Sequence, residues 1–244
     1  MKMVTRRWML RGAAASALPA ERPPFADGQT ITVSGREIFL TDIVAPSPTS
    51  LRGTVDQAAQ EAAIGLQQLL DQGLIAVPSS GPTDRWGRAI GPVSFHNTDG
   101  AKTTLQEALL LRGWARVFPQ SDNHDFLDRC FAAEDSARAL RLGLWAHSAY
   151  QVRDAHDLRR AIGLQIYRGT VVNAVEGRER IYINFGDDFR TDLTATVRRG
   201  DFRRWRSKEP VHYYGRRQME VRGLVESING PSIELRHERQ LRLI

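Results

Sequence analysis

The chain has 244 residues, of which 41% are hydrophobic and 25% are charged, as in an ordinary soluble globular protein. This length is generous for one small core and suits two domains of about 100 residues each. The only cysteine, Cys130, excludes an intrachain disulfide and the common cysteine-based metal motifs. Its spacing from Phe126 and Ala137 predicts a position on the core face of a helix.

The net charge of +6 is distributed unevenly. Residues 1–150 carry 15 basic and 15 acidic side chains, whereas residues 151–244 carry 19 and 13. Without the first 20 residues, the segment 21–150 has 11 basic and 15 acidic side chains, a net charge of −4. Because an acidic surface repels polyanions and a basic one attracts them, the charge places any affinity for a polyanion in the C-terminal half.

The first 20 residues combine Arg6-Arg7 with a short apolar stretch and small residues before a proline-rich start. Residues 1–20 therefore resemble a bacterial twin-arginine export signal, which predicts a periplasmic or extracellular location. The apolar stretch is short for such a signal, so a disordered basic tail and a misassigned start codon are the alternatives. It is far below the ~20 residues of a membrane-spanning helix, and no membrane span is predicted.

A hairpin and a helix are expected next. Residues 29–33 and 37–43 alternate in hydropathy around Ser34-Gly35, which is typical of two strands joined by a tight turn. The pattern Thr54-x-x-Gln57 predicts a capping box, after which apolar residues recur at helical spacing as far as Gly73.

Two more helices are predicted before residue 144. Thr104-x-x-Glu107 indicates the start of a short helix that ends at Gly113. A third helical stripe runs from Phe126 to Leu140, with Asn123-His124-Asp125 as its capping segment. Strands followed by helices on one side predict an α+β arrangement for this half.

Residues 148–163 are polar and charged, and are expected to form a linker or a short exposed helix. Beyond them, five segments have strand character, and they predict a second small β-barrel over residues 164–244. These segments are residues 165–175, 180–185, 192–197, 218–227 and 232–235.

One series of motifs resembles a known family. The run Asp84-Arg85-Trp86-Gly87-Arg88 follows Ala45-Pro46, and Arg112-Gly113-Trp114 and Gly143-Leu144-Trp145 come after it. This order resembles the staphylococcal nuclease-like (thermonuclease) family over roughly residues 25 to 147. The resemblance implies an OB barrel of five strands with three helices over residues 24–147. The pattern from Ile183 to Leu235 resembles OB-type domains that accompany some bacterial nuclease-like domains, so the whole is expected to be α+β followed by β.

The same resemblance implies a phosphodiester-cleaving site. In the family a divalent cation, usually Ca2+, is held by two carboxylates, a glutamate is the general base, and two arginines neutralise charge on phosphorus. Such a site suits the chemistry, because a hard cation prefers anionic oxygens and a water nucleophile needs a proton acceptor.

Most of these positions differ in this chain. Gln29 and Val44 align with the two carboxylate ligands of the family. Phe39 stands at the position of the first arginine, and Ser47 at the position of the general base. Arg88 is the one catalytic position retained. Loss of a general base alone typically costs 10²–10⁴-fold in rate, so we expect ordinary metal-dependent nuclease activity to be impaired. No cofactor is predicted, and Ca2+ would enter only with an active site rebuilt around the weak metal candidates Asp27 and Asp42.

Arg88 has two interpretations. It binds a phosphate or another anion without chemistry, or it pairs with an acid such as Asp84 and braces the turn. Trp86 and Phe118 lie at positions that resemble the family's nucleotide-side aromatics, with core or rim packing as the simpler alternative.

The best nucleic-acid candidate is a basic segment with interleaved aromatics in the second domain. OB barrels bind single strands through a basic groove and stacking aromatics, although a solvated charged helix between strands explains the same residues. Its members are Arg198, Arg199, Arg203, Arg204, Trp205, Arg206, Tyr213 and Tyr214.

Three functions remain open at this point. The leading hypothesis is an exported protein, catalytically impaired, that acts in binding or structure with single-stranded nucleic acid or another polyanion. The alternatives are an active phosphodiesterase with a rebuilt site and a protein-binding adaptor.

Overall fold

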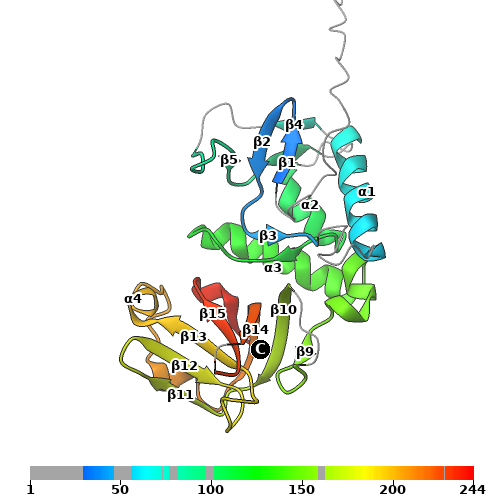
Figure 1. The fold of residues 1–244 in the computed structure, drawn as a ribbon. Helices are drawn as coiled ribbons and strands as arrows, with labels where there is room; N and C mark the ends of the chain where they lie inside the picture. The colour runs from blue at the N-terminus through cyan, green and yellow to red at the C-terminus, as the bar shows by residue number, and fades with distance from the viewer. Residues whose placement is uncertain are drawn as a thin grey trace, which may run out of the picture.

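The computed structural model describes residues 30–46, 56–72, 74–76, 82–96, 102–158, 163–227 and 229–244. The residues at positions 27, 29 and 47 and the proposed export signal lie outside this part. Figure 1 shows two bodies, one containing the helices α1, α2 and α3 and the other built around a large curled sheet. In the described part of the chain, no helix is both long enough and apolar enough to cross a membrane.

The predicted first hairpin is confirmed. Strand β1 (Thr30–Val33) pairs antiparallel with β2 (Arg36–Phe39), and both turn residues, Ser34 and Gly35, have positive φ, as tight two-residue hairpin turns require. Strand β5 (Ala89–Ile90) lies parallel to β2, with Phe39 opposite Ile90. This pairing brings the chain just before β5 next to the end of β2.

The remaining strands of the N-terminal half form small separate sheets. Among the described residues, β3 (Ile43–Val44) pairs with β8 (Arg116–Val117), and β6 (Ser94–His96) lies between β4 (Leu74–Ala76) and β7 (Lys102–Thr104). These sheets do not join into one closed barrel within the described residues. The α+β class is therefore present, whereas the described residues do not show the expected five-stranded barrel.

Three helices pack against these sheets, as predicted. Helix α2 (Leu105–Leu111) begins with the expected capping box of Thr104 and Glu107. Helix α1 (Gln57–Gln72) begins two residues later than the predicted Thr54 cap allows, and the Asp56 carboxylate accepts the Ala59 N–H there at 3.1 Å. The residue that caps α1 is thus Asp56, and Thr54 lies outside the described residues.

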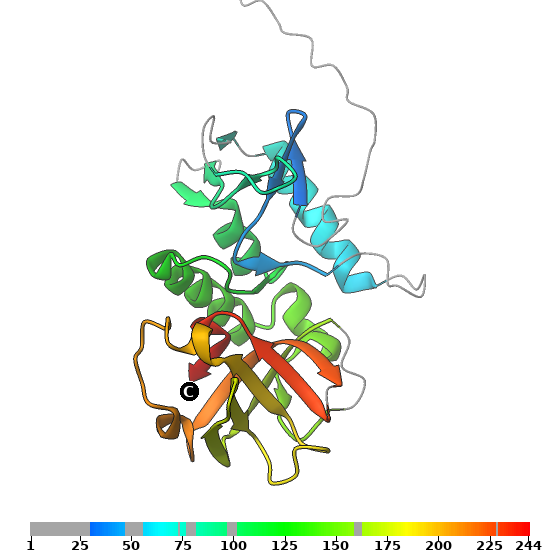
Figure 2. The ribbon, with the colours of Figure 1, turned by 60° about the vertical axis from the view of Figure 1, so that its left-hand side comes forward.

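Helix α3 (His124–Ala139) is capped by Asn123, whose side chain accepts the Phe126 N–H at 3.1 Å, in agreement with the predicted capping segment. Its core face includes the fully buried Cys130, and burial raises the pKa of this thiol. The stripe ends before Leu140, which is 70% exposed rather than part of the core. Helix α3 closes one side of the N-terminal core and also borders the second body (Figures 1 and 2).

All five strand segments predicted in the C-terminal half are present. Their sheet has the order β11-β12-β13-β15-β14-β10, in which β13 and β15 are parallel. The first segment bends at Val171 and Val172, so that β10 pairs with β14 and β11 pairs with β12. The strands are β10 (Leu164–Thr170), β11 (Asn173–Glu176), β12 (Arg180–Asn184), β13 (Thr194–Arg198), β14 (Gln218–Ser227) and β15 (Pro231–Leu235).

Two strands of the C-terminal half were not expected. Strand β9 (Arg153–Asp154) lies within the predicted linker but pairs with β10, and Ala155 after it is buried in the C-terminal core. This part of the linker therefore belongs to the second domain. Strand β16 (Leu241–Leu243) pairs with β14, and helix α4 (Arg199–Phe202) is only one turn long.

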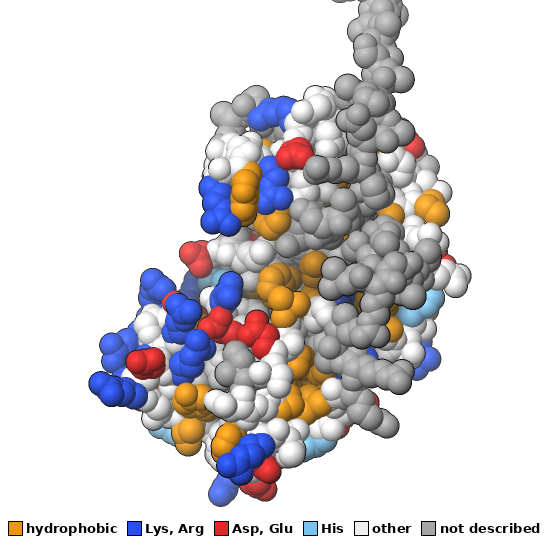
Figure 3. All heavy atoms as spheres, viewed as in Figure 1, with side chains coloured by type: hydrophobic (Ala, Val, Ile, Leu, Met, Phe, Trp, Pro, Cys, Tyr) orange, Lys and Arg blue, Asp and Glu red, His pale blue; other side chains and the backbone are white. Residues whose placement is uncertain are grey.

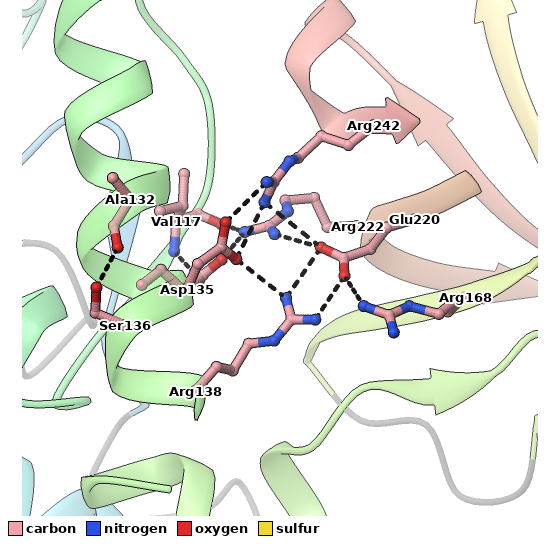
Figure 4. Close-up of polar contacts among 10 residues, drawn as sticks. Val117, Ala132, Asp135, Ser136, Arg138, Arg168, Glu220, Arg222 and Arg242 are labelled. Carbon is pink, nitrogen blue, oxygen red and sulfur yellow. Dashed lines mark hydrogen bonds and ion pairs between the residues drawn. The ribbon is translucent and has the colours of Figure 1, made fainter. Parts of the chain in front are cut away.

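A buried network of ions joins the two halves. Glu220 of β14 accepts hydrogen bonds from Arg222 at 2.8 Å and from Arg138 of α3 at 2.9 Å. Arg222 also contacts Glu134 of α3 at 2.8 Å and donates to the Val117 carbonyl. Figure 4 shows Arg168 and Arg242 directed toward Glu220 from β10 and β16. The contacts come from both domains, so the network fixes one against the other.

Candidate functional site

The turn that carries Arg88 is organised by Asp84. One carboxylate oxygen of Asp84 accepts the backbone N–H groups of Trp86 and Arg88, both at 2.9 Å. The other accepts the Arg88 Nε at 2.6 Å. Gly87 has a φ of +82°, a conformation that favours glycine at this turn. The ion pair predicted between Arg88 and Asp84 is therefore present.

Aromatic rings and a hydroxyl complete the surroundings of Arg88. Its Nη1 donates to the Thr30 hydroxyl at 2.7 Å, and its Cζ lies 4.7 Å from the centre of the Phe39 ring and 5.0 Å from that of Trp86. The side chain is only 16% exposed. The Phe39 ring thus lies within cation–π distance of Arg88.

The charge of this pair is maintained by its hydrogen bonds. Burial alone would raise the pKa of Asp84, but the Arg88 side chain and the two backbone N–H groups lower that pKa below its ordinary value. Asp84 thus remains ionised beside Arg88 at neutral pH.

Asp42 is a structural acid. It is fully buried in a turn with a φ of +68°, and its carboxylate accepts Gln120 N–H and Ser121 N–H at 2.8 Å and the Ser121 hydroxyl at 2.7 Å. Asp42 is therefore not a solvated acid at the end of a strand. A carboxylate that is saturated with internal donors and closed to solvent is also a poor cation ligand.

Among the described residues, the remaining family positions supply no further metal ligand. Val44 lies in β3 opposite Arg116 and offers no side-chain oxygen, while the substituted positions 29 and 47 and the candidate Asp27 lie outside the described residues. In the described ranges, no three His, Cys, Asp or Glu side chains come together as metal ligands. The residues that the structure places at the family's site do not fit a calcium ion.

The two aromatics predicted near this site differ in exposure. Trp86 is 64% exposed and lies under the Arg85 guanidinium, whose Cζ is 4.0 Å from the ring centre. Phe118 is half-buried, and its N–H donates to the Asp42 carbonyl. Trp86 is therefore accessible to a ligand, whereas Phe118 belongs to the turn around Asp42.

The aromatic residues of the basic C-terminal segment are largely structural. Trp205 and Tyr214 are each 5% exposed, and their rings pack on Phe202 with centres 4.9 and 6.1 Å away. They belong to the core of the second domain. Tyr213 is half-buried under the Arg217 guanidinium at 3.9 Å. The expectation that these rings form a stacking surface fails for Trp205 and Tyr214, because their faces are already packed.

The arginines of that segment, in contrast, lie at the surface. Arg198, Arg203, Arg204 and Arg206 are exposed, and Figure 3 shows basic side chains gathered on the C-terminal half on the side where α4 lies, with acidic ones among them. Arg199 pairs with Glu176 and Arg204 with Asp201. The surface is basic, and part of its charge is neutralised internally.

Sequence reasoning missed a hollow on the outer face of the C-terminal sheet. It has a volume of about 470 Å3 and is lined by residues of β11, β12, β13 and β15 and of two loops, including Tyr182 and Phe189. Alternation along β12 places Tyr182 outside, but no local pattern connects it with Phe189 in the following loop. Only the folded sheet brings them together.

Comparison with known protein families identifies one match. The family described as staphylococcal nuclease homologue matches residues 37–147, so this segment is a staphylococcal nuclease-like domain. The match covers the Arg88 turn, Asp42 and helices α1 to α3, and it ends before the C-terminal sheet. A search of curated proteins found no match to the chain.

Proposed function

We propose that this protein, with its staphylococcal nuclease-like domain at residues 37–147, is a nuclease-family member that binds nucleic acid without hydrolysing it. In this proposal the N-terminal domain serves as a scaffold, and the C-terminal domain binds single-stranded nucleic acid or another polyanion.

The observation that carries the first half of the proposal is the environment of Arg88. Catalysis needs fixed donors aimed at charge that develops in the transition state. Here the Arg88 guanidinium is directed at Asp84 and Thr30 and flanked by Phe39. These contacts engage the guanidinium within the fold, and Val44 supplies no ligand for a cation. The rebuilt active site based on Asp42 has no support, because that carboxylate is enclosed.

A cleavage assay tests this half. The purified chain, incubated with single- or double-stranded DNA or with RNA, should give no Ca2+-stimulated products. Arg88→Ala should behave like the unaltered chain in the same assay. Cleavage that requires Ca2+ and is lost in Arg88→Ala would refute the proposal.

The second half rests on charge and on strand order. Residues 151–244 carry 19 basic and 13 acidic side chains. The sheet order β11-β12-β13-β15-β14-β10 with a bent first strand supports the interpretation as a five-stranded OB-type domain. We infer an OB-type domain whose basic surface around α4 attracts a polyanion. Binding driven by counterion release weakens steeply with salt.

Salt titrations locate this affinity. For the full chain and a single-stranded oligonucleotide, replacing Arg203, Arg204 and Arg206 together with alanine should flatten the plot of log affinity against log salt concentration. Each lost phosphate contact removes about 0.7 from the slope for single strands. Arg88→Ala is the matched control and should leave the slope unchanged. A slope that changes only with Arg88→Ala would place the affinity in the N-terminal domain instead.

We also propose that residues 1–20 direct export through the twin-arginine route. When fused to a reporter that functions only outside the cytoplasm, residues 1–24 should give activity, and Arg6→Lys with Arg7→Lys should abolish it. A reporter that is insensitive to the double change would refute this route.

A further inference from the structure

The hollow on the C-terminal sheet has a neutral, polar floor. Asn184, Thr194 and Thr196 face outward from the two central strands, and Ser232 adds a hydroxyl from β15. The Thr194 hydroxyl donates to the Asn184 amide oxygen at 3.0 Å. No acidic residue is among the described residues that line the hollow. Such a floor can hydrogen-bond a flat, uncharged polar group without having to desolvate a charge.

Two aromatic side chains line the hollow. Tyr182 of β12 is 39% exposed, and Phe189, in the loop after β12, is 54% exposed. The Tyr182 ring lies over Gly177, where an added Cβ would come within 2.8 Å of it. A side chain at position 177 would thus displace the ring. Exposed aromatic rings beside a polar floor are typical of surfaces that bind bases by stacking.

One end of the hollow is basic. Arg180 and Arg198 are direct cross-strand partners, and with Arg236 they surround Glu234 at 2.8, 3.6 and 3.2 Å. Burial opposes ionisation of Glu234, but hydrogen bonds from Arg180 and Arg236 lower its pKa. Three guanidinium groups against one carboxylate leave a net charge of +2. This end continues directly into α4, which begins at Arg199.

The rim of the hollow is held in place by close backbone packing. Gly230, in the turn before β15, has a φ of +133°, and an added Cβ would lie 2.0 Å from the Phe189 carbonyl oxygen. The loop that carries Phe189 therefore packs directly on this turn. This packing fixes the position of the Phe189 loop, and a fixed rim lowers the ordering cost of binding.

We propose that this hollow binds unpaired bases of a single-stranded nucleic acid, with Tyr182 and Phe189 stacking on them and the phosphates directed toward Arg180, Arg198 and Arg236. The proposal rests on the function proposed above for the C-terminal domain and extends its contact surface from the basic segment around α4 to the sheet face. A single strand is the occupant that fits, because the hollow joins a neutral aromatic end to a basic end, as a nucleotide joins a base to a phosphate. A duplex would keep its bases stacked on each other and away from the rings.

Two probes of equal length test the proposal on the full chain: an oligothymidylate and an abasic strand with the same number of phosphates. Fluorescence anisotropy should show tighter binding of the oligothymidylate. Tyr182→Ala and Phe189→Ala should each weaken it by about 5- to 150-fold, the equivalent of 1–3 kcal/mol of stacking per base, and should not change binding of the abasic strand. Tyr182→Phe keeps the ring and should bind like the unaltered chain. Leu140→Ala, an exposed position on the N-terminal domain, is the control for surface truncation.

The outcomes separate this proposal from the function on which it rests. If both probes bind equally and Tyr182→Ala changes neither, the hollow is not the site, although polyanion binding stands. If Trp86→Ala or Tyr213→Ala weakens oligothymidylate binding and Tyr182→Ala does not, the bases bind elsewhere and the proposal is wrong. If the unaltered chain binds neither probe, the proposed function fails as well. Circular dichroism of each variant identifies any loss that comes from misfolding.

Discussion

Arg88 in the N-terminal domain and Arg222 between the domains have the same kinds of partners. Each contacts a carboxylate, at 2.6 Å from Asp84 and 2.8 Å from Glu220, and each lies 4.7 Å from the centre of a phenylalanine ring, Phe39 or Phe131. They differ in depth, because the Arg88 side chain is 16% exposed and that of Arg222 is 1% exposed.

The solvent exposure of each ion pair determines how much it contributes to stability. An ion pair near water gains little, because both ions are well solvated when separated, and its median value is about 0–1 kcal/mol. A fully buried pair is not strongly stabilising compared with an apolar replacement, but removing one partner leaves an uncompensated charge at a cost of about 3–5 kcal/mol. The Arg222 network therefore makes the relative placement of the domains sensitive to its acids, whereas the Arg88 pair braces one turn.

The largest expected effect follows from neutralising the central acid of the buried network. Glu220→Gln leaves Arg222 and Arg138 without their shared carboxylate, and the free energy of unfolding should fall by about 3–5 kcal/mol. Urea denaturation followed by circular dichroism measures it. Asp84→Asn is the matched control and should lose clearly less, because its ion pair lies closer to water. Equal losses in the two variants would contradict the role assigned to depth.

Acid pH provides a second way to test the network. Burial would raise the pKa of Glu220, but Arg222 and Arg138 lower it to about 2 from the ordinary value of 4.5. Because the folded pKa lies below the unfolded one, the contribution of Glu220 is complete above pH 4.5 and is lost as the pH falls toward 2. The free energy of unfolding should decrease across this range by a few kcal/mol. In Glu220→Gln that part of the decrease should be absent; an unchanged pH profile would argue against the assignment.

Substitution of Asp42 should lower the free energy of unfolding by an amount between those expected for the two arginine pairs. Asp42→Ala removes the acceptor for three donors on Gln120 and Ser121 in a turn that is closed to solvent. Hydrogen bonds to charged groups contribute about 1.5–3 kcal/mol each, with water recovering part of this where the turn opens. We expect an overall loss of about 2–3 kcal/mol in the same denaturation assay. No loss would show that the turn forms without its acid.

Local sequence patterns were sufficient to predict the elements that depend on residues close together in the chain. The capping box at Thr104, the hairpin at Ser34-Gly35 and the strands after residue 163 each depend on residues close in sequence, and the structure contains them all. The family resemblance, carried by the Arg88 turn and its neighbouring motifs, is confirmed for residues 37–147.

Features that depend on tertiary contacts were not predictable in this way. In the sequence, Arg222 and Glu220 cannot be distinguished from other charged residues of a strand. They are buried where β14 packs against α3. Trp205 and Tyr214 stand among arginines in the sequence, yet their rings fill the core beneath α4. Tyr182 and Phe189 line the same hollow, although they lie on a strand and on the loop that follows it. In each case the sequence shows the residue type but not the depth.

The smallest expected effect is that of Arg88 itself. Arg88→Met keeps much of the aliphatic length beside Phe39 and removes the charge that pairs with Asp84. Because this pair is near the surface, the free energy of unfolding should change by about 1 kcal/mol or less, and binding of a single-stranded oligonucleotide should stay the same. Both are measurable on one protein preparation, by denaturation and by anisotropy. A loss of 3 kcal/mol or more would mean that Arg88 resembles Arg222 after all, and that depth does not separate the two. A loss of oligonucleotide binding without a loss of stability would instead place a phosphate on Arg88, and the family's site would then have kept its ligand after losing its acids.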